Sequence, residues 1–520
     1  MSLGPQCWKC RERRVRCGSE TPKCAKCEAK GLVCPGYGPN KPLRWKKPQN
    51  PARMGNRQRN QVSLIEVRPL LWSSLVQISS IDQEIVYYNE NVAPDLVPID
   101  SPSNPFRWPL KVTGTANVPL FLNHIHASIS AFHRMARRRL AINKADSLPS
   151  QNTNLSADLL SSDPEEPTFC RYRASALRGL NDALSKNRSN ASAAALAGAM
   201  LLLFAQLQQG AYGPWRIHLD GFKTLINLYG GYEAFFDRQP HCNFVLSNLL
   251  VIDVVSATML PVGMMTPDTI NWHLAYLKAL PHVDYNSSPT PIPIPQDVLE
   301  SAILVNLARA SRCRPTNGVE IPILSLSGIL AELEVNRSWD NGPKDASSPS
   351  SLTTRTETLK RPDKPSGYAL FTECFRSAVM LYAIEGYSNT EMSFGRVTDT
   401  MLAPSVIQEV RNVAFVSLIN SIHALFQAKK DRYCQESYWK FIFWPLVVAG
   451  VHSTVCNRDR ENFGYICARL YEMAADLGTL SMRDAVLFLQ GLWIETSSSR
   501  PDATLRTWDD IFVDAPLFLL

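Results

Sequence analysis

Six cysteines near the N-terminus share one repeated spacing. Each half of the repeat reads C-x2-C-x6-C, and the second half begins 17 residues after the first. The six residues are Cys7, Cys10, Cys17, Cys24, Cys27 and Cys34. A C-x2-C pair can place two thiolates on one metal ion at the start of a short helix, and such thiolates hold many structural zinc ions. The repeat therefore predicts a small metal-binding module with approximate twofold symmetry.

The number of thiolates limits how many zinc ions they can hold. Structural zinc is almost always four-coordinate, so a single ion would leave two of the six thiolates unused. Two ions need eight ligand positions, which six thiolates supply only if two of them bridge both ions. The symmetric choice of bridges is the first cysteine of each half, Cys7 and Cys24. We therefore expect two Zn²⁺ ions per chain.

The six cysteines have two other interpretations. One is a disulfide knot, as in small secreted scaffolds, and the other is a zinc site that only stabilises the fold. The knot fits poorly because the sequence starts without the basic and apolar segments of a secretory signal and continues into a large body. We expect a reducing, intracellular environment. The other seven cysteines are scattered between Cys170 and Cys467. We expect them to act as small core residues.

The first 60 residues are strongly basic, and the rest of the chain is not. They carry 15 Lys and Arg against 3 Glu, whereas the other 460 residues carry 39 basic and 44 acidic side chains. This split indicates that the first 60 residues, the head, bind a polyanion, while the remaining residues, the body, have another role. Within the head, the first half of the cysteine repeat is the more basic one. It holds Lys9, Arg11, Arg13, Arg14 and Arg16.

The head resembles the DNA-binding domain of fungal zinc-cluster transcription factors, a Zn2Cys6 binuclear cluster. The segment Cys10–Cys17 is similar to the basic segment of that family, Pro22–Cys24 to its proline turn, and Gly31–Cys34 to the close of its second half. Gly18 departs from the family, many of whose members have Asp there, but the ligand set is intact. The resemblance implies a nuclear protein that binds double-stranded DNA at CGG half-sites.

The more basic half is the one expected to enter the major groove. A short helix from Trp8 to about Val15 would project Arg13 and Arg14 from its end, and arginine pairs bidentately with guanine. The resemblance implies that these two residues contact the CGG triplet. The remaining basic residues are expected to contact phosphates: Lys9, Arg11, Arg16 and Lys23, with Lys26 and Lys30 as weaker candidates.

A linker separates the head from the body. Residues 35–61 contain five prolines, three glycines and seven basic residues but no acidic one, which favours an extended, self-repelling segment. We assign 1–36 to the DNA-binding domain, 37–61 to the linker and 62–520 to a regulatory domain. After the linker, Leu71, Leu75, Ile78 and Ile85 have roughly heptad spacing, but Asp82 breaks the seam and fewer than three clean heptads result. The sequence therefore leaves a monomer and a homodimer both open.

The body is predicted to be all-helical, because apolar residues recur at three- and four-residue spacing and strand-like alternation is scarce. The expected helices are 118–142, 169–185, 191–209, 215–228, 243–259, 298–310, 323–333, 368–384, 404–428, 439–455, 462–477 and 483–493. Polar, proline-containing breaks at about 143–167, 281–296 and 337–366 are expected to be surface loops. The body also resembles the helical regulatory region of the same family. Tyr87–Arg107, His218–Ile226 and Phe443–Leu446 carry this resemblance in the family's order.

No enzyme motif stands out in the body. The dinucleotide, phosphate-loop, zinc-protease and serine-hydrolase patterns are all missing, so we predict that the chain is not an enzyme. We interpret His133–Arg139 as a solvated helix end rather than a second basic patch. The tail Trp508–Leu520 mixes acids with bulky apolar residues, as transactivation segments do. We favour a last helix that docks on the body.

Taken together, these features predict a nuclear, sequence-specific transcription factor of RNA polymerase II genes. It would bind zinc, DNA and the transcription machinery, and no membrane, because its longest apolar runs are far shorter than the roughly 20 residues of a span. The resemblance suggests a pathway-specific regulator, and its compact members suggest a secondary-metabolite gene cluster. An adaptor or an enzyme with a purely structural cluster is the alternative.

Overall fold

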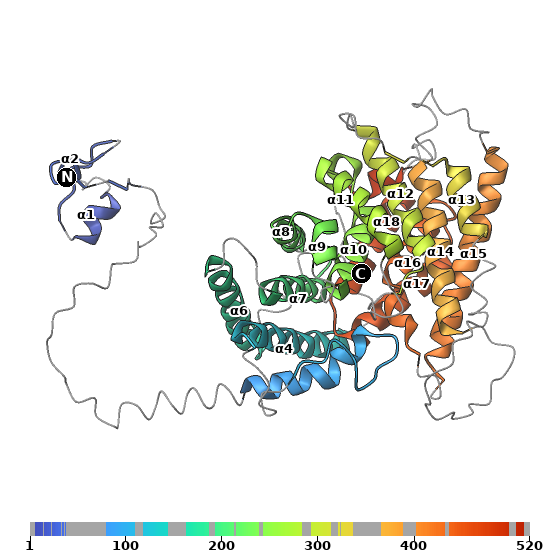
Figure 1. Ribbon diagram of the computed structural model, residues 1–520, viewed down its shortest axis with the longest axis horizontal. Helices are drawn as coiled ribbons and strands as arrows, with labels where there is room; N and C mark the ends of the chain where they lie inside the picture. The colour runs from blue at the N-terminus through green and yellow to red at the C-terminus, as the bar shows by residue number, and fades with distance from the viewer. Residues whose placement is uncertain are drawn as a thin grey trace. The chain divides into compact units, whose positions relative to one another are not determined.

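The computed structural model divides into two compact units, Met1–Leu71 and Trp72–Leu520. Figure 1 shows a small unit with two short helices and a large helical body. The structure describes residues 6–13, 15–21, 23–32, 34–35, 37, 80–109, 118–143, 163–186, 193–212, 215–238, 243–282, 293–313, 321–322, 324–335, 366–387, 402–431, 436–498 and 506–513. Over these residues there is no strand, which confirms the predicted fold class.

The head contains two short helices, α1 (Trp8–Glu12) and α2 (Ala25–Glu28). Each begins directly after the first cysteine of its half of the repeat, so the two halves start alike. Helix α1 is shorter than predicted. Its C-cap is Arg13, and the backbone then turns back, with the N–H of Val15 donating to Cys10. The expectation of a helix up to Val15 was therefore wrong by about one turn.

The body opens with a helix over 80–91, followed by the 3-10 helix η1 (Ala93–Leu96). These segments pack with α4 (Leu120–Asn143), α6 (Glu166–Lys186) and α7 (Ala193–Gln209). The opening helix was not predicted. It buries Ile85, which we had considered for a coiled-coil seam, in a cluster with Ala127 and Tyr172. The other heptad candidates, Leu71, Leu75 and Ile78, lie outside the described residues.

The remaining helices of the body pack around one large core. They are α8 (Trp215–Asn227), α9 (Tyr232–Arg238), α10 (Asn243–Thr258), η4 (Val262–Met264), α11 (Pro267–Ala279), η5 (Leu280–His282), α12 (Gln296–Cys313), α13 (Leu326–Val335), α14 (Gly367–Tyr387), α15 (Pro404–Ala428), η7 (Tyr438–Phe441), α16 (Phe443–Val455), α17 (Arg460–Leu477), α18 (Ser481–Ser498) and α19 (Trp508–Ile511). The expected helices are present, apart from 439–455, which is divided into η7 and α16. Helices α9 and α11 were not predicted. The three expected loops lie mostly outside the described residues.

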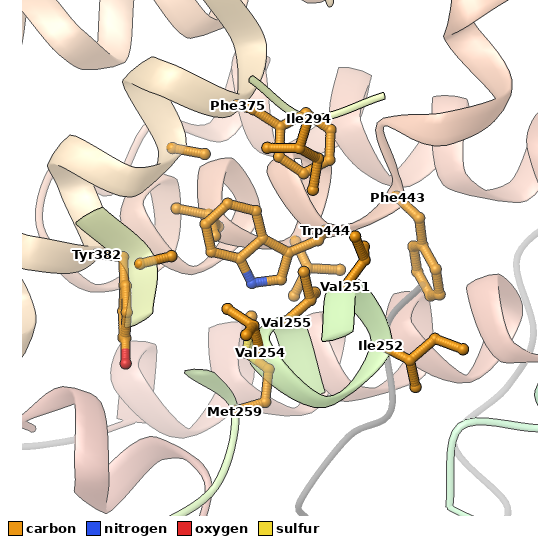
Figure 2. Packing of buried hydrophobic residues seen from close by; sticks show 14 of the residues in the cluster. Val251, Ile252, Val254, Val255, Met259, Ile294, Phe375, Tyr382, Phe443 and Trp444 are labelled. Carbon is orange, nitrogen blue, oxygen red and sulfur yellow. The ribbon is translucent and has the colours of Figure 1, made fainter. Parts of the chain in front are cut away.

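Trp444 shows why this core is continuous. Its indole lies between α10 and α14, next to Val251 and Val255 on one side and stacked on Phe375 on the other (Figure 2). The indole N–H donates to the hydroxyl of Thr258 at 2.8 Å, so the polar atom of this buried ring is satisfied. Helix α10 is buried on all sides from Leu246 to Thr258, as expected of a helix surrounded by others.

The segment His133–Arg139 is not a solvated helix end, contrary to our interpretation. It lies inside α4, where His133 is buried. Arg134 forms ion pairs with Glu84 at 2.8 Å and Glu165 at 3.0 Å. Arg138 pairs with Glu165 as well. These arginines therefore join α4 to the opening helix and to the turn just before α6, and periodicity alone did not reveal their acidic partners.

The prediction that the isolated cysteines are core residues can be compared with the structure at four positions. Cys374 and Cys467 are buried and Cys456 is half-buried, but Cys170 is exposed on α6, where the core interpretation was wrong. The side chains of Cys242, Cys313 and Cys434 lie outside the described residues.

Candidate metal centre and DNA-binding surface

The structure gathers the N-terminal cysteine side chains into two overlapping groups of four. The groups are Cys7, Cys10, Cys17 and Cys24, and Cys7, Cys24, Cys27 and Cys34. Within each group all sulfur atoms lie within 4.8 Å of one another. Cys7 and Cys24, the pair that we expect to bridge two ions, belong to both groups.

The distances between the sulfur atoms fit tetrahedral zinc. The Sγ atom of Cys24 lies 3.7 Å from that of Cys7 and 3.7 Å from that of Cys10, and the Cys7–Cys27 distance is 3.8 Å. Four sulfurs around a zinc ion with bonds of about 2.3 Å stand about 3.8 Å apart along each edge of the tetrahedron. A disulfide needs a separation of about 2.05 Å, and all six thiols are free. The donor set therefore suits zinc and does not form a disulfide knot.

Local backbone geometry places the two shared sulfurs. Cys7 is the N-cap of α1, and its sulfur accepts the N–H of Cys10 at 3.4 Å. Cys24 is the N-cap of α2, and its sulfur accepts the N–H of Cys27 at 3.3 Å. In both halves the C-x2-C spacing thus brings the second cysteine back toward the first through one helical turn. The N–H groups also favour negative charge on the capping sulfur.

Burial opposes ionisation of the central thiols. It raises the pKa of Cys7, Cys10 and Cys27 to about 12. At Cys17 desolvation acts in the same direction, but hydrogen bonds from the backbone N–H groups of Cys7 and Ser19 lower the pKa to about 6. A bound divalent cation favours the thiolate form of every ligand. Metal binding by these residues is therefore expected to release protons.

Tyr37 and Glu20 belong to the environment of the cysteines, although we did not predict either. The hydroxyl of Tyr37 lies 3.9 Å from the sulfur of Cys17 and donates to the carbonyl of Glu20 at 2.8 Å. The Glu20 carboxylate accepts the N–H of Ala25 at 3.0 Å, at the start of α2. An acidic residue near the start of a helix is a signal that can be recognised in the sequence, so Glu20 could have been identified. Tyr37 was hidden because it stands among the prolines and glycines that we assigned to the linker.

The predicted DNA-contacting residues that the structure describes lie in or beside the two short helices of the head. Lys9 and Arg13 are one helical turn apart and share a face, and Arg13 caps the helix with an exposed side chain. The guanidinium of Arg11 lies 5.1 Å from the ring centroid of Trp8, so the other face of α1 carries a cation–π pair. Arg14 lies outside the described residues. The other predicted phosphate contacts, Arg16, Lys23, Lys26 and Lys30, are exposed.

Comparison with known families identifies both units. Residues 6–43 match the Fungal Zn(2)-Cys(6) binuclear cluster domain. Residues 85–519 match the Fungal specific transcription factor domain. The second match covers most of the chain and almost all of the helical body. No solved structure matches the chain.

Curated relatives of the chain are transcriptional regulators, and two of them are named for a cluster. The chain is 23% identical over 514 residues to the phomenoic acid biosynthesis cluster-specific transcriptional regulator of Leptosphaeria maculans, covering 97% of this chain and 87% of that protein. It is 39% identical over 61 residues to the ustiloxin B cluster transcription factor of Aspergillus flavus, or 12% of this chain and 9% of that protein. It is 50% identical over 40 residues to a Diaporthe leptostromiformis transcription factor, phomR, or 8% and 6% of the two chains. Among the helices that the structure describes, none has the length and apolar character needed to cross a membrane.

Proposed function

Because the chain belongs to the fungal specific transcription factors that carry a Zn(2)-Cys(6) binuclear cluster domain, we propose that it regulates RNA polymerase II genes from the nucleus by reading CGG-type triplets in DNA. Membership of this family makes it a transcription factor and not an enzyme. The observation that supports the mechanism is the pair of overlapping four-thiol groups, one of which includes Cys7 at the N-cap of the basic helix α1 and Cys10 within this helix. Such a centre can fix the start of α1, from which the basic side chains project.

The metal would act by ordering the head. Cys7 and Cys24 would each be shared between two Zn²⁺ ions, and metal binding would supply folding free energy to a unit whose helices have only five and four residues. Arg13 and Arg14 would then read guanine edges. The positioning contacts to phosphate would come from Lys9, Arg11, Arg16 and Lys23.

The names of the relatives support a further step. The match that spans 97% of this chain is to a cluster-specific regulator of phomenoic acid biosynthesis. We propose that this chain likewise regulates one biosynthetic pathway and, by the same analogy, that the products of this pathway are secondary metabolites. We keep the division into a DNA-binding domain (1–36), a linker (37–61) and a regulatory domain (62–520), and we assign recruitment of the transcription machinery and any homodimer contact to the last.

In vitro selection from a random DNA pool tests the proposal. The full-length protein with zinc should enrich CGG-containing sequences, and EDTA should abolish the enrichment. A control variant with Arg13→Ala and Arg14→Ala should keep its zinc but lose the CGG preference. One half-site in the selected sequences would indicate a monomer, and two at a fixed spacing a homodimer. No enrichment by a protein that holds two zinc ions would overturn the proposal in favour of an adaptor with a structural cluster.

A further inference from the structure

The body contains a cavity of about 160 Å³ between its opening segment, residues 80–98, and the helices α4, α7, η7, α17 and α18. Its wall is mainly apolar and includes Tyr88, Ile129, Leu201, Phe204, Phe441 and Met482. An apolar cavity of roughly 150 Å³ can hold one benzene molecule. The space is therefore large enough for a single six-membered ring or a short branched chain.

The charged groups at this cavity neutralise each other. The Nζ atom of Lys440 lies 2.8 Å from a carboxylate oxygen of Asp95, and it also donates to the carbonyl of Pro94 at 3.2 Å. Both side chains line the cavity and are largely shielded from solvent. Because the pair leaves no net charge, an ionic ligand would meet no unmatched partner here. An uncharged ligand suits this wall better.

One polar atom at the cavity has no hydrogen-bond partner. The side-chain Oε1 of Gln208 is buried and unsatisfied, although Gln208 lines the cavity. The backbone of the same residue is fixed, since its carbonyl accepts the N–H of Leu480 at 2.9 Å. A buried acceptor without a donor is costly, and a ligand that donates a hydrogen bond removes that cost.

The neighbouring hydroxyls do not serve as that donor. The hydroxyl of Thr479 lies 3.4 Å from the backbone carbonyls of Leu207 and Gln208 and 2.9 Å from the hydroxyl of Ser481. The Ser481 hydroxyl itself donates to the carbonyl of Leu207. Both hydroxyls are thus directed to the backbone at the end of α7. The side-chain oxygen of Gln208 therefore has no protein donor among the described residues, and because it is buried, a ligand in the cavity would reach it after a rotation of the Gln208 side chain.

We propose that this cavity binds a small uncharged molecule that has an apolar part about the size of a benzene ring and one hydroxyl group, which donates to Gln208 Oε1. The cavity wall joins the opening segment of the body to η7 and to the start of α18. The N–H of Ser437, just before η7, also donates to the carbonyl of Pro98 at 2.8 Å. A bound ligand would therefore hold the opening segment of the body more firmly against α7, η7 and α18.

Calorimetric titration of the full-length protein with three probes tests this proposal independently of DNA binding. Phenol has the ring and the hydroxyl, toluene lacks the hydroxyl, and benzoate carries a charge. We expect phenol to bind about tenfold more tightly than toluene, as one added hydrogen bond allows. Benzoate should bind more weakly than phenol. Absence of phenol binding would overturn the proposal.

Two variants locate the binding. Gln208→Leu keeps the side-chain volume and should abolish the preference for phenol over toluene, whereas the same change at Gln427, exposed on α15, should leave it intact. Leu201→Phe should fill the cavity and weaken both probes at least tenfold, with circular dichroism confirming that the helices remain. If Gln208→Leu still prefers phenol, or if Leu201→Phe binds both probes like the wild type, the site lies elsewhere and the proposal fails.

Discussion

Arg309 and Asp509 lie 200 residues apart in the chain, yet their side chains form an ion pair with an N–O distance of 2.5 Å. The arginine is completely buried in α12, and its other donors reach the hydroxyl of Tyr382 at 2.7 Å and the carbonyl of Leu260 at 2.7 Å. The aspartate comes from α19, which Trp508 anchors with an indole N–H bond to the carbonyl of Thr258. The tail therefore supplies the negative charge for a cation deep in the body.

This contact predicts that Asp509→Ala destabilises the body strongly. Removing one partner of a buried ion pair leaves an uncompensated charge, which costs about 3 kcal/mol or more. Urea denaturation followed by far-ultraviolet circular dichroism, which reports mainly on the helical body, measures the loss. Glu495→Ala is the control, because its ion pair with Arg506 is largely exposed and contributes at most about 1 kcal/mol. Equal effects of the two changes would contradict this account.

The docked tail also decides between two interpretations of the sequence. We favoured a helix that packs on the body, and residues 506–513 confirm it, with Trp508 and Phe512 buried. Residues 514–520 lie outside the described part of the chain. The acidic residues of the tail are therefore at least partly structural, since Asp509 is committed to Arg309.

A second prediction concerns the shared sulfurs. Cys24→Ser should reduce the zinc content from two ions per chain to none, because Cys24 belongs to both four-thiol groups. Elemental analysis of the purified protein measures this directly. Cys170→Ser changes an exposed thiol of the body and should retain both ions. One tightly held zinc in Cys24→Ser would show that this residue does not bridge.

A third prediction separates base reading from phosphate binding. Arg13→Ala should reduce discrimination at one guanine by about 1–3 kcal/mol, because a bidentate contact is lost. Lys9→Ala should instead weaken binding to all sequences alike. It should also reduce the steepness of the plot of log affinity against log salt concentration by about one, because one phosphate contact is lost. Titrations on a CGG site and a mutated site at several salt concentrations distinguish the two. Identical behaviour of both variants would refute the assignment of roles.

The sequence predicted the head and the helical class of the body for local reasons. The C-x2-C spacing spans one helical turn, so it places its two sulfurs together wherever the rest of the chain lies. Helices α4 and α15 could be predicted from the sequence because apolar residues recur at the helical period over long segments. Helix α11 was missed, although Thr266 and Pro267 form a cap-and-first-turn signal that could have identified it.

Contacts between distant segments could not be predicted in this way. Arg309 and Arg376 are fully buried cations, although the spacing of apolar residues in their helices does not distinguish them from exposed arginines. Each depends on partners from another element. The cavity at Gln208 likewise needs walls from both ends of the body. A single sequence specifies which faces are apolar, but it does not specify which of those faces meet.

Histidine burial in α4 provides a final testable relationship. His126 is 1% exposed, stacks on Trp108 with ring centroids 4.2 Å apart, and meets the edge of Tyr88. Its Nδ1 lies 2.8 Å from the carbonyl of Leu122, which identifies the Nδ1–H tautomer of a neutral ring. Desolvation by burial lowers the pKa of His126 from 6.5 to about 4.

The lowered pKa predicts that acid destabilises the body. Below pH 6.5 the unfolded chain protonates His126, whereas the folded chain does so only near pH 4, so stability present above pH 6.5 is lost as the pH falls through this window. The loss from this residue is on the order of 3 kcal/mol. His126→Phe keeps a stacked ring and should flatten the fall in unfolding free energy measured by urea denaturation. His282→Phe, at an exposed position, should not, and both variants share any effect of acid on the zinc ligands. A parallel fall in wild type and His126→Phe would show that other groups control the acid response.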